Sequence, residues 1–240
     1  MPYTRPFVTR SLISYAGDSS QRRLALAVRP IDTFTGIPAT APMRIELKEL
    51  PNARATRNQS GFFCFEGRED KNGNEMIYKA GDYTLIVEPD SAVADWFFLE
   101  PAPGQAWSFE FTRKITLPMK APRTPEEPIR WAPSPSYPFP YNSTLVRGTV
   151  VQGGGPDPQK LAGVVVSTTY KQTDPQDTSA TKDHPIETQS DNKGEFVLFF
   201  QALPGATQQI SLTAVKNGQQ IQQQANIMEG TATNEVVVFP

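Results

Sequence analysis

Side chains that could perform chemistry are scarce in this chain of 240 residues, which contains one histidine, His184, and one cysteine, Cys64. A single residue of each kind excludes an internal disulfide and every metal site that needs several His or Cys ligands from one chain. The same scarcity excludes most nucleophilic dyads and triads. His184 lies in the polar stretch TKDHPIE, which we interpret as a solvated loop without the positioned partner that acid–base catalysis needs. We therefore expect a protein that is not an enzyme, with no catalytic residue and no cofactor.

The environment of Cys64 is predicted to be a strand, because it lies in the apolar stretch GFFCFE. If Gly61 fixes the register, Cys64 shares a face with Phe62, while Phe63 and Phe65 enter the core. A strand provides neither the basic neighbour nor the helix end that makes a thiol reactive. A packed or half-covered cysteine is therefore expected.

Carboxylates could hold calcium in the second predicted domain, residues 144–240, where five aspartates occur: Asp157, Asp174, Asp177, Asp183 and Asp191. Their spacing matches no EF-hand loop or other ligand pattern, so no metal site is predicted. The sequence GGGPDP at residues 153–158 lacks the Lys-Ser/Thr pair and the following helix of a phosphate-binding loop. We interpret it as a flexible hairpin tip.

The charge balance argues against nucleic acid, since 23 Lys and Arg face 25 Asp and Glu for a net charge of −2, with no long run of one sign. No stretch approaches the 18 or so apolar residues of a membrane span. The N-terminal residues show no apolar segment of the kind found in secretory signals. The expectation is a cytoplasmic protein without a membrane span, which could act within a particle assembled there.

Short β-rich stretches bounded by Gly, Pro, Asn and Asp predict an all-β fold, and no segment keeps a helical period. In 43–50, Met43, Ile45 and Leu47 alternate with charged residues, as in a half-buried strand of an antiparallel sheet. The predicted strands are 23–29, 43–50, 61–66, 82–88, 96–99, 107–117, 144–151, 161–170, 187–190, 195–200, 209–215, 221–227 and 235–239.

A proline-rich stretch separates the two groups of strands, because eight of the 23 residues from Pro118 to Pro140 are proline. Such a density favours polyproline II and is incompatible with a position inside a sheet. The predicted organisation is a β-sandwich over 1–118 with an N-terminal extension, a linker over 119–143, and a second sandwich over 144–240.

Both halves contain the same turn signature, an Asx followed three residues later by a glycine and two residues after that by a phenylalanine. It occurs as Asn58, Gly61 and Phe63 in the first half. In the second half it is formed by Asp191, Gly194 and Phe196. The Asx side chain closes the turn, the glycine takes a positive φ, and the phenylalanine points into the core. The two halves are thus predicted to be Greek-key sandwiches of one kind.

The second half resembles the carboxypeptidase regulatory-like family, also called transthyretin-like or prealbumin-like, through LVRGTVV, LAGVVVSTTY and TQSDNKGEFVLFF in that order. The resemblance covers nearly all of residues 144–240. The first half looks like a divergent copy in which Asn58 replaces the aspartate and the L-x-G-V element is absent. The family implies a seven-stranded Greek-key sandwich without catalytic residues that serves as an accessory, adhesive or structural module.

Exposed aromatic and apolar residues are the candidates for contacts with other chains. The candidate interface residues are Trp96, Phe98, Trp131, Tyr137, Phe139, Tyr141, Val237 and Phe239. The aromatics of the linker either dock a partner or strap the linker onto the sandwiches, with packing inside the chain favoured. The last two residues lie in EVVVF, an apolar strand of the type that a partner can extend.

These observations lead us to expect a structural or adaptor subunit whose partners are the other proteins of a large assembly. A phage-tail-like contractile injection particle is one assembly of this kind. The alternative is a module that binds carbohydrate or peptide through exposed aromatics, and an accessory domain of an enzyme encoded elsewhere comes third.

Overall fold

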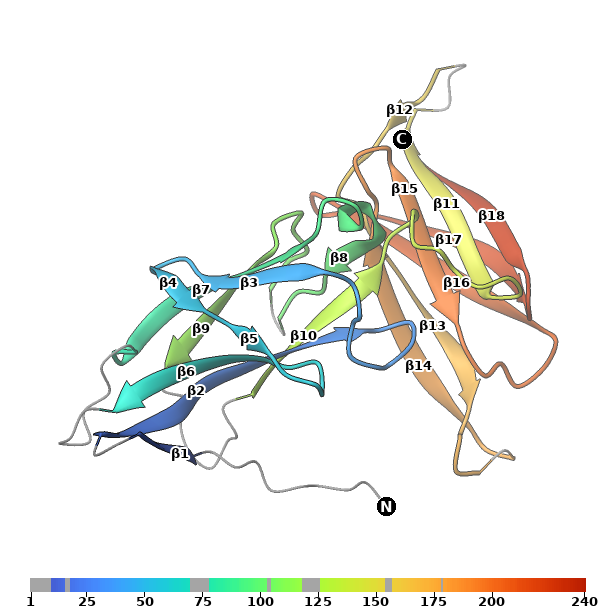
Figure 1. Ribbon diagram of the computed structural model, residues 1–240. Coiled ribbons are helices and arrows are strands. Elements are labelled where there is room, and N and C mark those ends of the chain that lie inside the picture. Colours follow the sequence, from blue (N-terminus) through green and yellow to red (C-terminus); the bar gives the residue numbers. More distant parts are fainter. Residues whose placement is uncertain are drawn as a thin grey trace. The chain divides into compact units, whose positions relative to one another are not determined.

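The computed structural model describes residues 10–15, 18–69, 78–102, 105–117, 126–153, 157–177 and 179–240. Apart from the 3-10 turn η1 (Ala94–Trp96), the regular elements in these ranges are β-strands, so the predicted all-β fold class is confirmed. The chain divides into two compact units (Figure 1). The first comprises Met1–Ala94 with Glu110–Trp131, and the second comprises Asp95–Phe109 with Ala132–Pro240. Residues 95–109 therefore belong to the second unit, whereas the sequence placed them in the first sandwich.

One sheet has the order β5-β6-β2-β10-β8, with β1 also on β2; its last strand, β8 (Phe97–Leu99), and the end of β10 belong to the second unit. Its other strands are β1 (Arg10–Tyr15), β2 (Asp18–Asp32), β5 (Thr56–Arg57), β6 (Phe63–Glu69) and β10 (Glu126–Pro133). β6 pairs with β2 in the antiparallel direction, while β10 pairs with β2 in parallel, so that Trp131 lies opposite Asp32. The central strand of this sheet therefore has neighbours of both directions.

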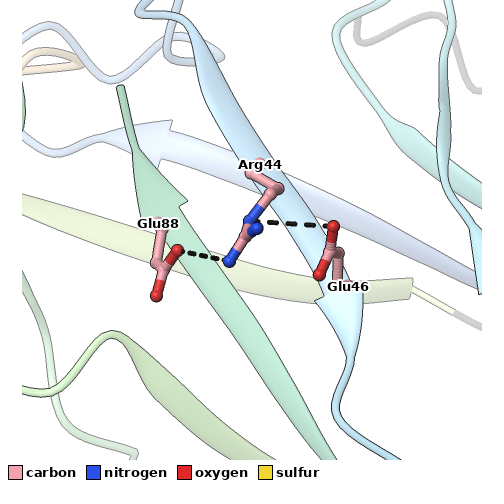
Figure 2. A network of polar contacts seen from close by, with 3 residues as sticks. All are labelled: Arg44, Glu46 and Glu88. Atoms are coloured by element: carbon pink, nitrogen blue, oxygen red, sulfur yellow. Dashed lines mark hydrogen bonds and ion pairs between the residues drawn. The ribbon is translucent and has the colours of Figure 1, made fainter. Parts of the chain in front are cut away.

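The second sheet of the first unit has the order β4-β3-β7-β9 and is antiparallel throughout. Its strands are β3 (Met43–Leu47), β4 (Leu50–Arg54), β7 (Gly81–Pro89) and β9 (Thr112–Leu117). Ile45 and Leu47 of β3 are buried, and Arg44 faces solvent, as the alternation predicts. Figure 2 shows the Arg44 guanidinium between two carboxylates, 2.8 Å from Oε2 of Glu88 and 3.7 Å from Oε1 of Glu46. These partly exposed ion pairs lie on the outer face of the sheet and contribute little to the free energy of folding.

The core of the first unit is formed by the inward-facing residues of its strands. Its fully or almost fully buried members include Leu26, Val28, Leu47, Phe65, Leu85, Val87, Ile129 and Trp131. They come from β2, β3, β6, β7 and β10, so the core requires strands from both sheets.

The second unit is built from two sheets, of orders β12-β11-β15 with β18 on β11, and β14-β13-β16-β17. The strands of the unit are β8 (Phe97–Leu99), β11 (Thr144–Gln152), β12 (Gln159–Lys160), β13 (Val165–Thr173), β14 (Thr181–Gln189), β15 (Glu195–Phe200), β16 (Thr207–Lys216), β17 (Gln219–Met228) and β18 (Ala232–Phe239). β18 pairs with β11 in parallel over its whole length, from Ala232 opposite Leu145 to Phe239 opposite Gln152. The core lies between the two sheets and includes Val146, Phe196, Leu212, Ile227 and Phe239.

The two units share one strand order. Each has an antiparallel sheet of four strands, β4-β3-β7-β9 in the first and β14-β13-β16-β17 in the second. Each also has a sheet in which one strand pairs antiparallel with one neighbour and parallel with the closing strand, as in β6-β2-β10 and β15-β11-β18. Within the described residues, β10 thus corresponds to β18 as the closing strand of its unit.

The prediction that the proline-rich stretch lies outside any sheet is wrong for Glu126–Pro133, which form β10. Register explains how this strand tolerates a proline. The Thr33 amide donates to the Trp131 carbonyl at 3.0 Å, so Trp131 and Ile129 direct their backbone groups toward β2. Pro128 alternates with them, and its nitrogen, which has no hydrogen to donate, faces away from β2. Residues 119–125 of the predicted linker lie outside the described part of the chain.

The segment around His184 is also not the loop that the sequence suggested, because it belongs to β14. Pro185 follows His184 in this strand, which pairs only with β13 among the described strands. A proline is tolerated at a sheet edge, where its missing amide hydrogen leaves no ladder bond unmade. In the 107–117 segment the strand is shorter than predicted, since β9 begins at Thr112.

Candidate functional site

The two Asx turns have the same hydrogen bonds. Oδ1 of Asn58 accepts from the amides of Ser60 and Phe62 at 3.0 and 2.9 Å, and the Gly61 amide donates to the Asn58 carbonyl at 3.1 Å. Gly61 has a φ of 82°, and Phe63, two residues later, is buried. This arrangement starts β6 and shapes the unit, and the side-chain oxygen of Asn58 is engaged within the turn.

The second turn has the same network and lies immediately before β15. Oδ1 of Asp191 accepts from the amides of Lys193 and Glu195 at 2.8 and 2.9 Å, and the Gly194 amide donates to the Asp191 carbonyl at 2.9 Å. Gly194 has a φ of 75°, and Phe196 is fully buried. Asp191 is thus engaged in a turn.

Cys64 and His184, the two side chains with reactive potential, both have packed environments. Cys64 is half-buried in β6 beside Asn58, whose Nδ2 lies 3.9 Å from Sγ. Burial, and after it the carboxylate of Glu66, raises the pKa of the Cys64 thiol above its ordinary value. A raised pKa keeps the thiol protonated and poorly nucleophilic. The ring of His184 packs edge-on against Tyr170, with 5.4 Å between the centroids.

Of the remaining aspartates, Asp174 and Asp177 close turns of their own. Oδ1 of Asp174 accepts from the amide of Gln176 at 2.8 Å. The hydroxyl and the amide of Ser179 both donate to Oδ1 of Asp177, and these bonds lower the pKa of the Asp177 carboxyl. Within the described ranges no group of three or more His, Cys, Asp or Glu side chains could hold a metal ion. Residues 154–156 of the predicted hairpin tip lie outside these ranges.

The aromatic residues of the predicted linker pack within the chain. Trp131 is only 1% exposed and stacks at 5.6 Å against Phe111 in the first unit, so its assignment to an interface is corrected. Tyr137 lies 4.8 Å from Phe139 and 5.4 Å from Phe97 of β8, measured between ring centroids in the second unit. These contacts follow the packing alternative that the sequence analysis favoured.

Arg147 of β11 fastens this proline-rich segment to its sheet. Its Nη1 donates to the carbonyl of Pro135 at 2.6 Å, and its guanidinium lies 5.4 Å from the ring centroid of Phe139. The cation–π contact and the hydrogen bond together hold residues 135–139 across the outer face of β11. Tyr141, two residues beyond Phe139, is 95% exposed and is the one linker aromatic among those described that is left open to solvent.

The Trp96–Leu99 segment is covered inside the second unit. Trp96 ends η1 and is partly exposed, and its carbonyl accepts from the amide of Ser134 at 2.8 Å. Phe98 is buried and packs edge-on against Phe109, with 6.4 Å between centroids. Phe98 is therefore a core residue, and its assignment to an interface is corrected.

The closing strand β18 presents a different face from the one predicted. Val237 and Phe239 are each 1% exposed and belong to the core, so their assignment to an interface is corrected. Val236 and Val238 alternate with them and are 57% and 44% exposed. The stretch EVVVF is apolar at successive positions, so the sequence alone did not fix which valines point outward.

The backbone of β18 follows the same alternation. The carbonyl of Thr231 accepts from the Leu145 amide, and the carbonyl of Phe239 accepts from the Gly153 amide, both at 2.9 Å. Because the parallel register is unbroken between these two bonds, the odd-numbered residues of β18 direct their backbone groups to β11. Val236 and Val238 accordingly direct their N–H and C=O groups to the side on which no described strand pairs.

A groove of about 550 Å³ lies on the outer face of the β14-β13-β16-β17 sheet. It is lined by Ser167, Thr168, Thr169, Pro185, Ile186, Glu187, Ser211, Thr213 and Gln222. Ser167 lies opposite both Glu187 and Thr213, and Thr213 lies opposite Gln222, so these four form one row across the sheet. Small side chains on the two central strands make the hollow.

Glu187 of the groove lining contacts a tryptophan that lies outside the sandwich strands. The indole N–H of Trp107 donates to Oε1 of Glu187. The neighbouring residue is fixed as well, since Nε2 of the buried Gln189 donates to the Ser108 carbonyl at 3.2 Å. This site was not predicted from the sequence. The alternation of Ser and Thr with Val and Leu in β13 and β16 was the available signal, but it did not reveal which strands are neighbours.

Comparison with known proteins adds no functional assignment. No family model and no curated protein matches the sequence. Solved structures that are similar include the minor pilin GBS52 of Streptococcus agalactiae, at 10% identity over 89% of this chain and 94% of that chain, with a TM-score of 0.28. The shaft pilin SpaA of Lactobacillus rhamnosus GG matches at 12% identity over 91% and 97% of the two chains, with a TM-score of 0.26. At such low TM-scores these likenesses carry no argument about function.

A search for membrane-spanning helices gives one result. Across the described residues, no helix has the length and apolar character needed to cross a bilayer.

Proposed function

We propose that this protein is a non-catalytic structural or adaptor subunit that joins a multi-protein assembly through the open edge of β18. The observation that carries the proposal is the outward direction of Val236 and Val238, in both side chain and backbone. An edge of this kind can accept a strand of another subunit, which would pair with the free N–H and C=O groups and cover the valines.

The closing strand of the first unit supports this interpretation by contrast. Trp131 of β10 and Phe239 of β18 occupy corresponding positions. The Trp131 carbonyl accepts a hydrogen bond from Thr33, the residue after β2, and the Phe239 carbonyl accepts one from Gly153, the residue after β11. The positions that hold Val236 and Val238 in β18 are therefore occupied by Pro128 and Arg130 in β10. Proline and charge are the residue types that discourage strand addition. In addition, β10 pairs with β8, whereas among the described strands β18 pairs with β11 alone.

The non-catalytic part of the proposal is supported by the packing of the two reactive side chains. His184 packs edge-on against Tyr170 within its sheet, and the pKa of the Cys64 thiol is raised. Neither setting activates a nucleophile or a general base. A carboxylate in either role would require a paired arrangement, and the turn aspartates are engaged in their own turns.

The test is to return the tagged chain to the cells that encode it and to follow its sedimentation. The wild-type chain should sediment with a large assembly and bury roughly 800 Å² or more per partner there. Val236→Pro removes an outward N–H while it leaves the bonds to β11 intact, so it should fold and remain slow-sedimenting. Val236→Thr keeps both the N–H and the β-branched shape and is the matched control. Sedimentation of the wild type as a lone monomer, or full incorporation of Val236→Pro, would contradict the proposal.

A phage-tail-like contractile injection particle is one assembly that could offer such a strand. It stays a prediction from the sequence, as does the cytoplasmic location, because neither the fold nor the comparisons favour it. The β18 edge is compatible with any assembly whose subunit supplies an extended segment.

A further inference from the structure

The groove over the β14-β13-β16-β17 sheet has free polar groups at its centre. The floor includes the hydroxyls of Ser167, Thr169, Ser211 and Thr213, which alternate with buried residues and so face outward. In the described part of the chain, no hydrogen bond occupies any of these four hydroxyls. Each can donate one bond and accept others. A ligand in the groove would therefore meet several donors and acceptors on one surface.

The charge of the groove selects among polar ligands. Glu187 is the only ionisable side chain in the lining, and its Oε1 already accepts from Trp107. The neighbouring Lys171 and Asp183 neutralise each other at 2.8 Å. None of the described lining residues is a cation that could attract phosphate, sulfate or an acidic sugar, whereas Glu187 would repel them. The groove favours a neutral ligand.

The location of the groove on the face of a sheet argues against a peptide strand. β13 and β16 are each paired along their length with an outer neighbour, β14 or β17, so the groove lies between two central strands and not at an edge. Between β13 and β16 the ladder covers Val165–Ser167 and Thr213–Val215, and beyond it the Thr168 hydroxyl donates to the Ser211 carbonyl at 2.9 Å. Strand addition requires free backbone groups at an edge. Recognition at this groove has to rely on side-chain hydroxyl, amide and carboxylate groups, which match a ligand rich in hydroxyls.

Trp107 supplies the apolar surface that such a ligand also needs. A pyranose ring has an apolar C–H face that packs on an aromatic ring, while its hydroxyls bond to neighbouring polar groups. The bond from the indole to Glu187 and the bond from Gln189 to the Ser108 carbonyl hold this residue beside Glu187 of the lining before any ligand arrives. Preorganisation of this kind reduces the entropy lost on binding.

We propose that the groove formed by β13, β14, β16 and Trp107 binds a neutral oligosaccharide. Its volume of about 550 Å³ lies within the range of small-molecule sites and has room for a short sugar chain. Ser167, Thr213 and Gln222 bond to the hydroxyls of the sugar, and Trp107 stacks on one ring. This activity is separate from the proposed assembly through β18, because it uses the other sheet of the second unit.

The experiment screens the full chain against an array of neutral oligosaccharides, and titrates the best one while ¹H–¹⁵N spectra are recorded. Binding should shift the amide signals of Ser167, Thr213 and the Trp107 indole. Trp107→Ala should weaken binding about tenfold or more, because a stacked ring contributes on the order of 1.4 kcal/mol. Thr213→Leu, which fills the groove on the solvent face, should weaken it as well.

The matched control is Tyr141→Ala, which removes an aromatic that is almost fully exposed and lies outside the groove. It should bind like the wild type, and thermal melting should show that all variants are folded. Three results would overturn the proposal: no neutral oligosaccharide of the array binds at millimolar concentration, only acidic sugars or peptides bind, or binding is unchanged in both groove variants. Because Val236→Pro leaves the groove intact, its binding separates failure of this site from failure of the assembly surface.

Discussion

At the scale of single residues, the two Asx turns show how few atoms define the start of a strand. In each, one side-chain oxygen accepts hydrogen bonds from two backbone amides, and one glycine adopts a positive φ that reverses the chain direction. The network then places a phenylalanine, Phe63 or Phe196, in the core. Because the side chain and the backbone cooperate, the loss of either component should weaken the unit that contains it.

We predict that Gly61→Val and Gly194→Val each destabilise their own unit by roughly 1–3 kcal/mol, because a β-branched residue at positive φ is strained. Contacts add to this strain. A Cβ at Gly61 would lie 2.9 Å from Cβ of Pro38, and one at Gly194 would lie 3.0 Å from the Val150 carbonyl oxygen. Hydrogen exchange of each unit under denaturant would measure the losses, with Gly205→Ala, which meets no atom within 4 Å, as control. Unchanged protection in the valine variants would contradict the turn assignment.

The sequence was sufficient for these turns because their information is local. Asn58 and Gly61, or Asp191 and Gly194, determine a conformation over four residues, whatever the rest of the chain does. The groove at Trp107 could not be found in the same way. Its members come from β13, β14, β16 and β17 and from Trp107, which lies 80 residues before Glu187, and only the pairing of the strands brings the lining residues to one face.

At the scale of elements, β10 is a strand that the proline-rich composition of its segment did not predict. Proline density correctly indicates that a segment avoids helices, but it does not exclude a strand in which a proline directs its nitrogen away from the neighbour with which the strand is paired. Pro128 is in this position beside β2. The same local rule explains Pro185 in the edge strand β14. Whether a proline nitrogen faces a neighbouring strand depends on the register of the pairing, and a single sequence does not reveal that register.

Trp131 provides the test of β10 as a structural strand. Trp131→Ala would remove a ring that is almost fully buried and packed on Phe111, at a cost of about 3–5 kcal/mol. Denaturant-dependent hydrogen exchange should show loss of protection in β2 and β6 of the first unit. Arg130→Ala, on the adjacent exposed position, is the control and should stay within about 0.5 kcal/mol of the wild type. If Trp131 belonged to an independent linker, its removal would leave β2 and β6 unchanged.

The local sequence also did not always determine which face of a strand points into the core. In β3 the alternation of apolar and charged residues fixed the inward side, and Ile45 and Leu47 are buried as predicted. In β18 three successive valines remove that alternation. The orientation is then decided by the core, which takes Val237 and Phe239 and leaves Val236 and Val238 outside. The exposed pair is consequently available for the function that we propose.

At the scale of the whole molecule, the repeated strand order makes each unit a reference for the other. Position by position, Trp131 corresponds to Phe239, Pro128 to Val236 and Arg130 to Val238. What the two units share, such as a buried aromatic at the end of the closing strand, serves the fold. What differs, such as the unprotected edge of β18, is the better guide to function.

The repeat also predicts that the two turns can exchange their Asx residues. Asn58→Asp and Asp191→Asn each keep an oxygen that can accept both amides, so each should change stability by no more than about 0.5 kcal/mol. Asn58→Ala and Asp191→Ala remove the acceptor from two amides and should cost about 1–3 kcal/mol. Urea unfolding followed by residue-resolved exchange would assign each loss to its unit. If Asp191→Asn proved as costly as Asp191→Ala, the negative charge would be essential at Asp191, and the two turns would be alike in geometry but not in energetics.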